Sequence, residues 1–451
     1  MRSKARVEVQ RSFLMPTLRE QLDPRQPLYQ LAEKLPWGEF EEAFAGYYSA
    51  DGRPAKAVRL MVGLLLLKQL HNLGDETVVA QWVQNPYWQF FCGLVEFQWS
   101  MPCDPSDLVY FRQRIGEEGV ALIFAASAQL HGKKAQESEV VIDSTVQEKA
   151  VTYPTDTKLC RRIIERCWKL ADRHEIKLRR RYRKAVRHSL LAQRWRQHPK
   201  RCKEARRGVR RLKTIAGRLV RELERKLPAE VRENQGENFA RYRKVLAQKP
   251  KDSGKIYSLH EPHIYCVAKG KEHKKYEFGT KASLAMTKNG GVLVAAIAHP
   301  ENSYDGHTLP EVLEQVEVVQ GQRPKIAIVD RGYRGSKEVD GTEILTPNRP
   351  PKDQTPQESK AMRKRFRRRC AIEPTIAHLK SDFRMARNYL RGFAGDALNV
   401  LLAATAWNLR KWLRLLRRYI QFIRQLFTSL SPHPATSAER VFQERLDYSG
   451  K

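Results

Sequence analysis

The chain has 451 residues, of which 83 are Lys or Arg and 50 are Asp or Glu, so its formal net charge is +33. Its composition, 41% hydrophobic and 29% charged, is typical of a folded soluble protein and excludes wholesale disorder, a collagen-like repeat and a membrane helix bundle. The length allows about three domains. The positive charge exceeds what solubility requires and favours a polyanionic partner, of which nucleic acid is the commonest.

The cysteines and the N-terminus indicate the compartment. The seven cysteines include no C-x-x-C pair and are odd in number, which argues against a disulfide framework and a zinc ribbon. A reducing compartment fits best. The first residues, MRSKARVEVQRSFL, are basic but lack the apolar core and small-residue cleavage site of a secretory signal. The sequence therefore predicts a cytoplasmic protein.

Residues 55–131 are predicted to be helical, because apolar residues recur at three- and four-residue spacing, with a turn at NPYWQFFCG (residues 85–93). The apolar run at 61–67 is far shorter than the roughly 20 residues that cross a bilayer, and it predicts a buried helix. Asp104-Pro105-Ser106-Asp107 is a start signal for a further helix. These patterns predict an all-helical N-terminal domain over residues 1–135.

A strand and then a very basic helical block follow. VVIDSTV at 140–146 predicts a short strand, so residues 136–158 are assigned to the first part of an α/β core. Residues 161–226 hold 26 Lys and Arg but only 6 Asp and Glu, a net charge of +20. A solvated helical hairpin would explain this block, yet charges of one sign repel each other, so polyanion binding is the stronger hypothesis. Residues 159–255 are predicted as a basic helical insertion after the first core strand.

The α/β core is expected to resume at residues 256–395. HIYCVAKG, YEFGTKASLAMT and GGVLVAAIAHP predict an antiparallel meander after the linker PKDSGK. LPEVLEQVEVV predicts a helix, KIAIVD a strand buried on both faces, and TEILTP a short strand. The Pro-rich loop NRPPKDQTP then leads to a helix expected from about 358 to 387.

The C-terminal part is predicted to form one more helix, over residues 396–428. Its apolar run is broken at helical intervals by basic residues, which predicts an amphipathic helix with a basic face. A helix that lies on a membrane surface would show a similar pattern. The polar tail, residues 429–451, is predicted to be mobile. The basic residues are Arg410, Lys411, Arg414, Arg417, Arg418 and Arg424.

Two predicted strands end in an aspartate, Asp143 and Asp330. A lone Asp after a strand usually forms a turn, but two on neighbouring strands are a common ligand arrangement, because the crevice of an open sheet lies there. Glu373 is the candidate for a third carboxylate, since Pro374 places it at or near a helix start or kink. Three such oxygen ligands would complete a Mg²⁺ site. An ion pair with the arginines before it is the alternative role of Glu373.

Other candidate residues have weaker support. Loop aspartates beside glycine usually form turns, and the histidines have no partners at a zinc-ligand spacing. Two hydroxyl residues follow Asp143, but no G-x-S-x-G elbow surrounds them. The residues set aside in this way are Asp156, Asp305, Asp340, Glu343, His299, His307, Ser144 and Thr145.

With these motifs, the chain resembles the bacterial insertion-sequence DDE transposases with an RNase H-like core, in particular the group typified by insertion sequence five. The signature of that group, Tyr-x2-Arg-x3-Glu-x6-Lys, appears here as Phe366-x2-Arg369-x3-Glu373-x6-Lys380, with Phe in place of Tyr. The segments VIDSTV, IVDRGYRG, DPSDLVYFRQR, ARNYLRG and TAWNLRKW are also similar to segments of that family. The resemblance covers most of residues 55–415.

The resemblance implies an enzyme that binds the terminal inverted repeats of a mobile element, cuts there with Mg²⁺, which Mn²⁺ can replace, and joins the 3′-hydroxyl ends to target DNA. It implies a homodimer on double-stranded DNA and no membrane partner. Two cations about 4 Å apart activate the attacking oxygen and stabilise the leaving one. Asp143 is expected to bridge them, with Asp330 and Glu373 as one further ligand each.

Several basic residues are expected to contact DNA because of their charge. Lys281 belongs to a predicted basic patch with Lys269, Lys271, Lys274 and Lys275. A structure-selective nuclease on the same fold is an alternative function, and so is a non-catalytic DNA-binding protein, which the intact carboxylates disfavour. The predicted DNA contacts are Arg331, Arg369 and Lys380 beside the carboxylates, Arg179, Arg180, Arg181 and Arg183 in the insertion, and Lys281.

Overall fold

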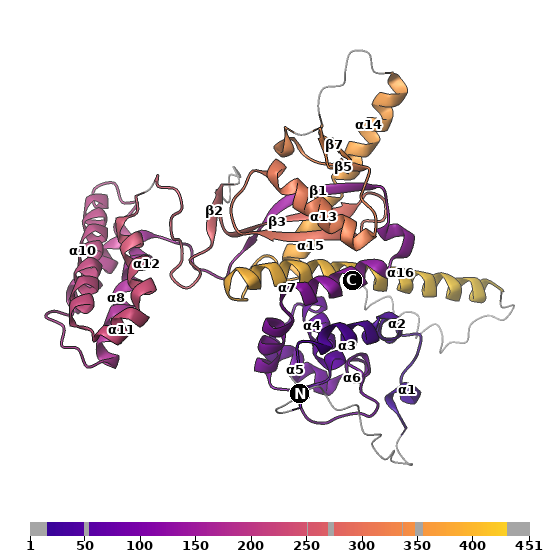
Figure 1. Cartoon of the computed structure of the whole chain (residues 1–451), viewed down its shortest axis with the longest axis horizontal. Coiled ribbons are helices and arrows are strands. Elements are labelled where there is room, and N and C mark those ends of the chain that lie inside the picture. Colours follow the sequence, from indigo (N-terminus) through magenta and orange to yellow (C-terminus); the bar gives the residue numbers. More distant parts are fainter. Residues whose placement is uncertain are drawn as a thin grey trace. The chain divides into compact units, whose positions relative to one another are not determined.

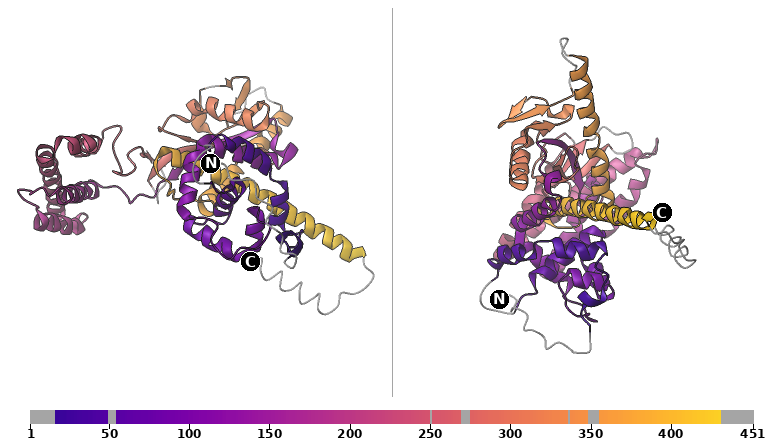
Figure 2. Two further views of the ribbon diagram at one scale, coloured as in Figure 1. Left: turned by 60° about the horizontal axis from the view of Figure 1, so that its bottom comes forward. Right: turned by 90° about the vertical axis from the view of Figure 1, so that its right-hand side faces the viewer.

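A computed structural model of the chain describes residues 16–48, 54–249, 251–268, 275–335, 337–347 and 355–430. The chain divides into two compact units, residues 1–133 with 405–451 and residues 134–404 (Figures 1 and 2). Several predicted features fall outside the described residues: the N-terminal segment MRSKARVEVQRSFL, Lys269, Lys271, Lys274, most of the loop NRPPKDQTP, and the tail beyond residue 430.

The first unit is helical where it is described, as predicted. The run 61–67 is buried within α4. The predicted turn at 85–93 is largely wrong, because Asn85 caps a new helix and Pro86 occupies its first position. The helices are α1 (Leu18–Gln21), α2 (Pro27–Lys34), α3 (Trp37–Ala45), α4 (Val58–Leu70), α5 (Asp75–Gln84), α6 (Pro86–Phe91) and α7 (Pro105–Gln129), followed by η1 (Gly132–Ala135).

Helix α7 begins at the predicted start signal. Asp104 is its N-cap and forms a reciprocal capping box with Asp107. Arg112 of this helix is buried and donates to both carboxylate oxygens of Asp75, at 2.8 and 2.7 Å. Lys68 Nζ lies 2.8 Å from Asp75 Oδ1. Because buried charges require partners, this triad ties α4, α5 and α7 together.

The second unit contains, within its described residues, a seven-stranded mixed sheet in the order β2-β3-β1-β5-β7-β6, with β4 paired to β3. Strand β1 runs antiparallel to β3 and parallel to β5, and β5 is parallel to β7. The predicted α/β class is thus confirmed. The strands are β1 (Glu139–Glu148), β2 (Tyr265–Ala268), β3 (Tyr276–Thr287), β4 (Leu293–His299), β5 (Ile326–Ile328), β6 (Glu338–Val339) and β7 (Thr342–Leu345).

The predicted meander is wrong in one respect. Strand β1 takes one edge of β3, so β2 and β4 pair with successive parts of the other edge. At the crowded position, Gly279 pairs with both Tyr265 and Glu148. A Cβ atom there would lie 1.9 Å from the Gln147 carbonyl oxygen, so only glycine permits this close approach.

The helix predicted over 358–387 is two helices, α14 (Pro356–Arg369) and α15 (Ile372–Asp382). The break lies at Cys370, because Pro374 has no N–H to donate to the Cys370 carbonyl. The Glu373 N–H donates to that carbonyl instead, at 3.3 Å. The other helices after β4 are η3 (Asp305–Thr308), α13 (Leu309–Gln320), η4 (Arg331–Tyr333) and α16 (Gly392–Leu430).

Helix α16 begins and ends close to the predicted C-terminal helix, and residues 392–404 of it belong to the second unit. Its later turns carry the predicted basic residues. Within the described parts of the chain, we find no helix long and apolar enough to cross a membrane. All seven cysteines lie in the described residues and are free, as predicted.

The basic segment between β1 and β2 folds into a group of helices with its own apolar core (Figure 1, magenta). Residues such as Ile163, Leu212, Leu219 and Phe239 fill that core, so most of the charged side chains stand on its surface. The segment is therefore more than a two-helix hairpin. Its helices are α8 (Asp156–Arg173), α9 (Arg183–Leu191), η2 (Ala192–Trp195), α10 (Cys202–Lys226), α11 (Ala229–Asn234) and α12 (Gly236–Ala247).

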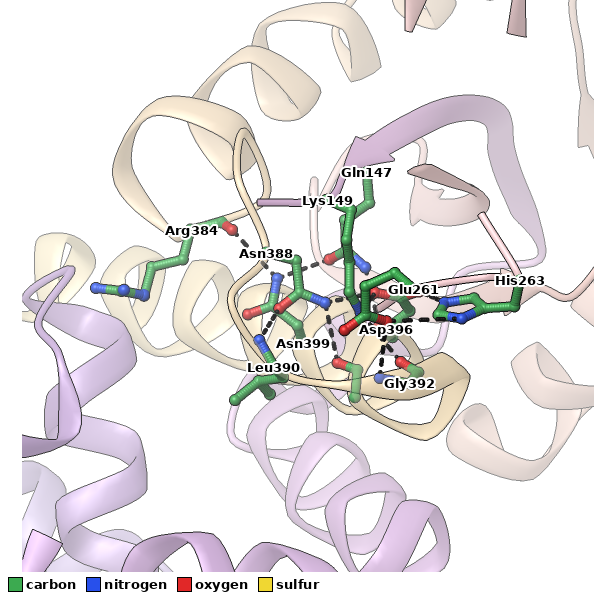
Figure 3. A network of polar contacts seen from close by, with 11 residues as sticks. Gln147, Lys149, Glu261, His263, Arg384, Asn388, Leu390, Gly392, Asp396 and Asn399 are labelled. Atoms are coloured by element: carbon green, nitrogen blue, oxygen red, sulfur yellow. Dashed lines mark hydrogen bonds and ion pairs between the residues drawn. The ribbon is translucent and has the colours of Figure 1, made fainter. Parts of the chain in front are cut away.

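A buried polar network joins the end of β1 to the start of α16 (Figure 3). Lys149 Nζ lies 2.7 Å from Asp396 Oδ1 and 3.5 Å from Glu261 Oε2. His263 Nε2 lies 2.8 Å from Asp396 Oδ2, and Asn388 Nδ2 donates to Asp396 Oδ1 at 2.6 Å. Since Lys149 precedes the inserted helices and Glu261 follows them, the network fixes both ends of the insertion to the core.

Backbone and amide contacts extend this network. Asn388 donates its N–H to the Glu148 carbonyl at 2.7 Å and accepts the Ala150 N–H at 2.8 Å. Gln147 Nε2 donates to the Asp396 carbonyl at 3.0 Å, and Asn399 Nδ2 donates to Gln147 Oε1 at 2.6 Å. The segment ARNYLRG, noted for its resemblance, thus contributes Asn388 to the structure of the core.

Candidate active site

Asp143 and Asp330 occupy corresponding positions on neighbouring parallel strands. Val141 of β1 pairs with Ile328 of β5, and each aspartate stands two residues further along. Asp330 caps η4 and accepts the Gly332 N–H at 2.7 Å. The prediction that Asp143 ends its strand is wrong, because β3 continues to pair with β1 as far as Glu148. Strand β5 ends at Ile328, so the sheet is open beside both aspartates.

The surroundings of Asp143 disfavour its ionised form. Its side chain is only 17% exposed. Burial raises the pKa of Asp143 from its ordinary value of 3.8 to about 6, against the effect of the Ser144 N–H. The carboxylates of Asp330 and Glu373 raise this pKa further, and the Arg369 guanidinium lowers it. Asp330 and Glu373 therefore lie close enough to act on Asp143, and a bound cation would relieve this repulsion.

Glu373 reaches this place from the second residue of α15, as the prediction of a helix start implied. Its side chain is 61% exposed. Arg369 lies between two of the carboxylates, with Nη1 3.8 Å from Asp143 Oδ2 and Nη2 3.3 Å from Glu373 Oε1. Arg369 thus serves as an internal counter-charge for both.

These donors fit a divalent cation by their chemistry, since three carboxylates outnumber one guanidinium and hard cations prefer oxygen ligands. Among the described residues, however, no three His, Cys, Asp or Glu side chains stand close enough together to hold a metal ion. Glu373 is exposed, and Arg369 stands between it and Asp143.

Asp305, which sequence analysis set aside as a turn residue, lies beside the two aspartates. It begins η3, which contacts η4. A Cβ atom on Gly332 would lie 2.9 Å from Asp330 Oδ1 and 3.3 Å from Asp305 Oδ2, so both carboxylates border the space beside this glycine. Asp305 Oδ1 forms an ion pair with Lys281 Nζ.

Lys281 does not fit its predicted role as a DNA contact. Its side chain is 8% exposed and points into the protein, where it pairs with Asp305 and donates to the Ser303 carbonyl at 2.6 Å. Lys281 is the one charged residue in the otherwise uncharged and buried C-terminal part of β3. That position is the sequence signal for a buried acidic partner, because a buried lysine is stable only when it is paired.

Tyr333 packs into the same cluster and was also missed. It is 1% exposed, and its hydroxyl forms no hydrogen bond of good geometry. Burial raises the pKa of the Tyr333 hydroxyl well above its ordinary value, and Asp305, Asp143 and Asp330 add to that effect. The Ser144 side chain acts in the opposite direction. A buried hydroxyl therefore stands among three carboxylates.

The remaining predicted DNA contacts lie in two places. Arg331 is exposed and donates its Nε–H to the Pro347 carbonyl at 3.0 Å, and Lys380 Nζ lies 3.8 Å from Glu277 Oε1. In the insertion, Arg181 pairs with Asp172. A groove of about 710 Å³ there is lined by Arg180, Arg181, Tyr182, Arg183, Lys184, Ala185, Arg211, Thr214, Ile215 and Arg218.

Comparison with known families identifies the family of this chain. Residues 16–114 match the transposase domain DUF772, and residues 254–409 match a transposase DDE domain. The chain belongs to the DDE transposases. It is therefore a metal-dependent enzyme that cleaves DNA and transfers strands, on a core of the RNase H-like fold. The matched DDE region includes Asp330 and Glu373. Asp143 precedes that region, and the pairing of β1 with β5 brings it beside Asp330.

Relatives add little about the function of this transposase. It is 45% identical over 180 residues to an uncharacterized protein, ORF8 in the nfe locus, of Rhizobium meliloti. That alignment covers 39% of this chain and 87% of the relative. No solved structure matches the chain. The resemblance to the group typified by insertion sequence five stays a prediction.

Proposed function

We propose that this transposase binds the terminal inverted repeats of its own mobile element, cuts the DNA there with Mg²⁺ and joins the freed 3′-hydroxyl ends to target DNA. One observation carries the proposal: Asp143 and Asp330 stand at matching positions beyond paired residues of neighbouring parallel strands, and Glu373 lies close enough to act on Asp143. With DNA as the substrate, the proposal includes a cytoplasmic location, at the nucleoid.

Asp143, Asp330 and Glu373 would hold the divalent cations. When bound, two such ions activate the attacking oxygen and stabilise the leaving oxygen. Asp143 is the proposed bridging ligand, because both of the other carboxylates act on it and it comes from the central strand. The all-oxygen donor set favours Mg²⁺ over softer metals.

The basic side chains around the carboxylates have a separate role. Arg369 neutralises part of the charge of Asp143 and Glu373. Lys380 lies seven residues after Glu373 on α15, two turns along the same face. We propose that Arg331, Arg369 and Lys380 contact phosphates of the DNA and orient the scissile bond.

We propose that the inserted helices bind DNA but take no part in its cleavage. Their apolar core leaves the net charge of +20 over residues 161–226 on the surface, where phosphates can reach it. The groove beside Arg180, Arg183 and Arg218 is the strongest candidate for that contact. Because a mobile element has two ends, we propose that two copies of the protein act together on DNA.

The test is incubation of the purified protein with labelled DNA from the end of the element and with Mg²⁺, followed by sizing of the products. A transposase yields a cut at the end of the element and, with target DNA, joined products longer than the substrate. Cleavage without joining would favour the nuclease alternative. Binding without cleavage would favour a non-catalytic DNA-binding protein.

A further inference from the structure

Asp305 is not one of the three predicted carboxylates, yet it borders the same space as Asp330. Its Oδ2 atom and Asp330 Oδ1 both stand close to the position that a Gly332 side chain would fill. The side chain of Asp305 is 26% exposed, so one of its faces reaches solvent. A cation bound at Asp330 would lie beside this second carboxylate.

Lys281 fixes the orientation of Asp305. Its ammonium group pairs with Asp305 Oδ1 and donates to the Ser303 carbonyl at 2.6 Å, so it is held from two sides. Lys281 comes from β3, whose neighbour β1 carries Asp143. One oxygen of Asp305 is thus engaged by Lys281, and the other, Oδ2, is directed toward Gly332.

Tyr333 is an independent observation on the same space. Its hydroxyl is buried, lacks a hydrogen bond of good geometry, and lies close enough to Asp305, Asp143 and Asp330 to feel their charges. A buried polar atom without such a bond is costly unless a ligand or water completes it. The chemistry that suits one hydroxyl and three carboxylates is a hydrated divalent cation.

We propose that Asp305 is a fourth carboxylate of the catalytic centre, that its Oδ2 atom contributes to binding the divalent cation held by Asp330, and that Lys281 is its positioning residue. This inference rests on the proposed function, since it requires a cation at Asp330. It goes beyond that function in naming a ligand, and a residue that orients it, outside the three predicted carboxylates.

The test is a titration of the full-length protein with Mn²⁺, in which free Mn²⁺ is measured by electron paramagnetic resonance. Asp305→Asn is expected to weaken Mn²⁺ binding by about tenfold or more, the usual cost of losing a ligand-shell group. Because that change leaves Lys281 buried and unpaired, the double variant Lys281→Met/Asp305→Asn removes both charges and preserves folding better. It is expected to show the same weakened Mn²⁺ binding with an unchanged melting temperature.

Two reference variants make the result decisive. Asp340→Asn changes an exposed loop aspartate that pairs with Arg323, and it is expected to bind Mn²⁺ as the unmodified protein does. Asp330→Asn is expected to lose Mn²⁺ binding. If Asp330→Asn loses binding while both Asp305 variants retain normal affinity, Asp305 is only a structural partner of Lys281 and the inference is overturned. Normal affinity in Asp330→Asn would overturn the proposed site itself.

Discussion

Two polar clusters, one within β1 and one just past its end, differ in whether their charges are balanced. Just past the end of β1, Lys149 meets Asp396 and Glu261 in a buried network where each of these charges has a partner. Six residues earlier, Asp143 stands among other carboxylates, and its pKa is raised to about 6, mainly by burial. The compensated cluster holds the chain together. The second, uncompensated cluster has one guanidinium, that of Arg369, for three carboxylates, and we propose that a catalytic cation relieves the remaining repulsion.

The largest expected effect of a substitution is at the uncompensated cluster. Asp143→Asn, Asp330→Asn and Glu373→Gln should each lower the rate of DNA cleavage by about a thousandfold or more, because bound metal supplies several kcal/mol of transition-state stabilisation. Combined substitutions should be scarcely worse than single ones, since the groups act as a unit. Product sizing in Mg²⁺ and in Mn²⁺ measures the decrease.

DNA binding should survive these changes, and it should tighten slightly because a repulsion of phosphates is removed. A binding assay on the same DNA is the control. Near-normal cleavage by one variant would remove that residue from the site. Equal losses of cleavage and of binding or folding would show that the residue is structural.

At the compensated cluster, the expected effect is on stability. Lys149→Met leaves Asp396 and Glu261 buried without their cation, and it should lower the free energy of unfolding by about 3–5 kcal/mol. Urea unfolding measures this. Arg161→Met, which breaks the exposed pair with Glu165, is the matched control and should cost about 1 kcal/mol or less. Similar costs for the two variants would mean that the network does not hold the core.

The inserted helices should affect DNA affinity without affecting chemistry. Replacing Arg179, Arg180, Arg181 and Arg183 by Gln should weaken binding to many sequences alike. It should also flatten the logarithmic dependence of affinity on salt by about 0.9 for each phosphate that the protein no longer neutralises. Binding titrations at several salt concentrations measure both quantities, with the melting temperature as a folding control. An unchanged affinity and salt dependence would identify the insertion as merely solvated.

The smallest expected effect is a pH dependence of stability at Asp143. The native state holds this proton more tightly than the unfolded chain, so stability is lost as the pH rises from 3.8 through about 6. Asp143→Asn should therefore be more stable than the unmodified protein at pH 8, by roughly 1–3 kcal/mol, with a difference that shrinks toward pH 4. Urea unfolding across this range measures it. A variant less stable at pH 8 would show that Asp143 has a favourable partner.

Local signals in the sequence were sufficient for much of the fold. Asp104 was identifiable as a helix cap from its neighbours, and the position of Pro374 marked the start of α15. Asp143 and Asp330 could be paired in advance because each follows a short apolar run that predicted a strand, although β1 continues beyond Asp143 to Glu148. In each case a few adjacent residues determine the conformation.

The interactions that escaped prediction join distant segments. Lys281 and Asp305 meet only because β3 pairs with β4 and η3 follows that strand, and a loop Asp before Gly otherwise indicates a turn. The network of Lys149 and Asp396 spans most of the second unit with no periodic signal. Nothing in the sequence around Gly279 indicates that β1 passes directly over this residue.

The proposed activity of this protein requires that the uncompensated carboxylates bind a divalent cation. The direct measurement is the melting temperature of the unmodified protein and of Asp143→Asn, each with and without Mn²⁺. A ligand stabilises the state that binds it, so Mn²⁺ should raise the melting temperature of the unmodified protein and leave that of Asp143→Asn unchanged. Without metal, the variant should melt at the same temperature or higher. An equal rise with Mn²⁺ in both proteins would contradict the claim, because the ion would then bind elsewhere.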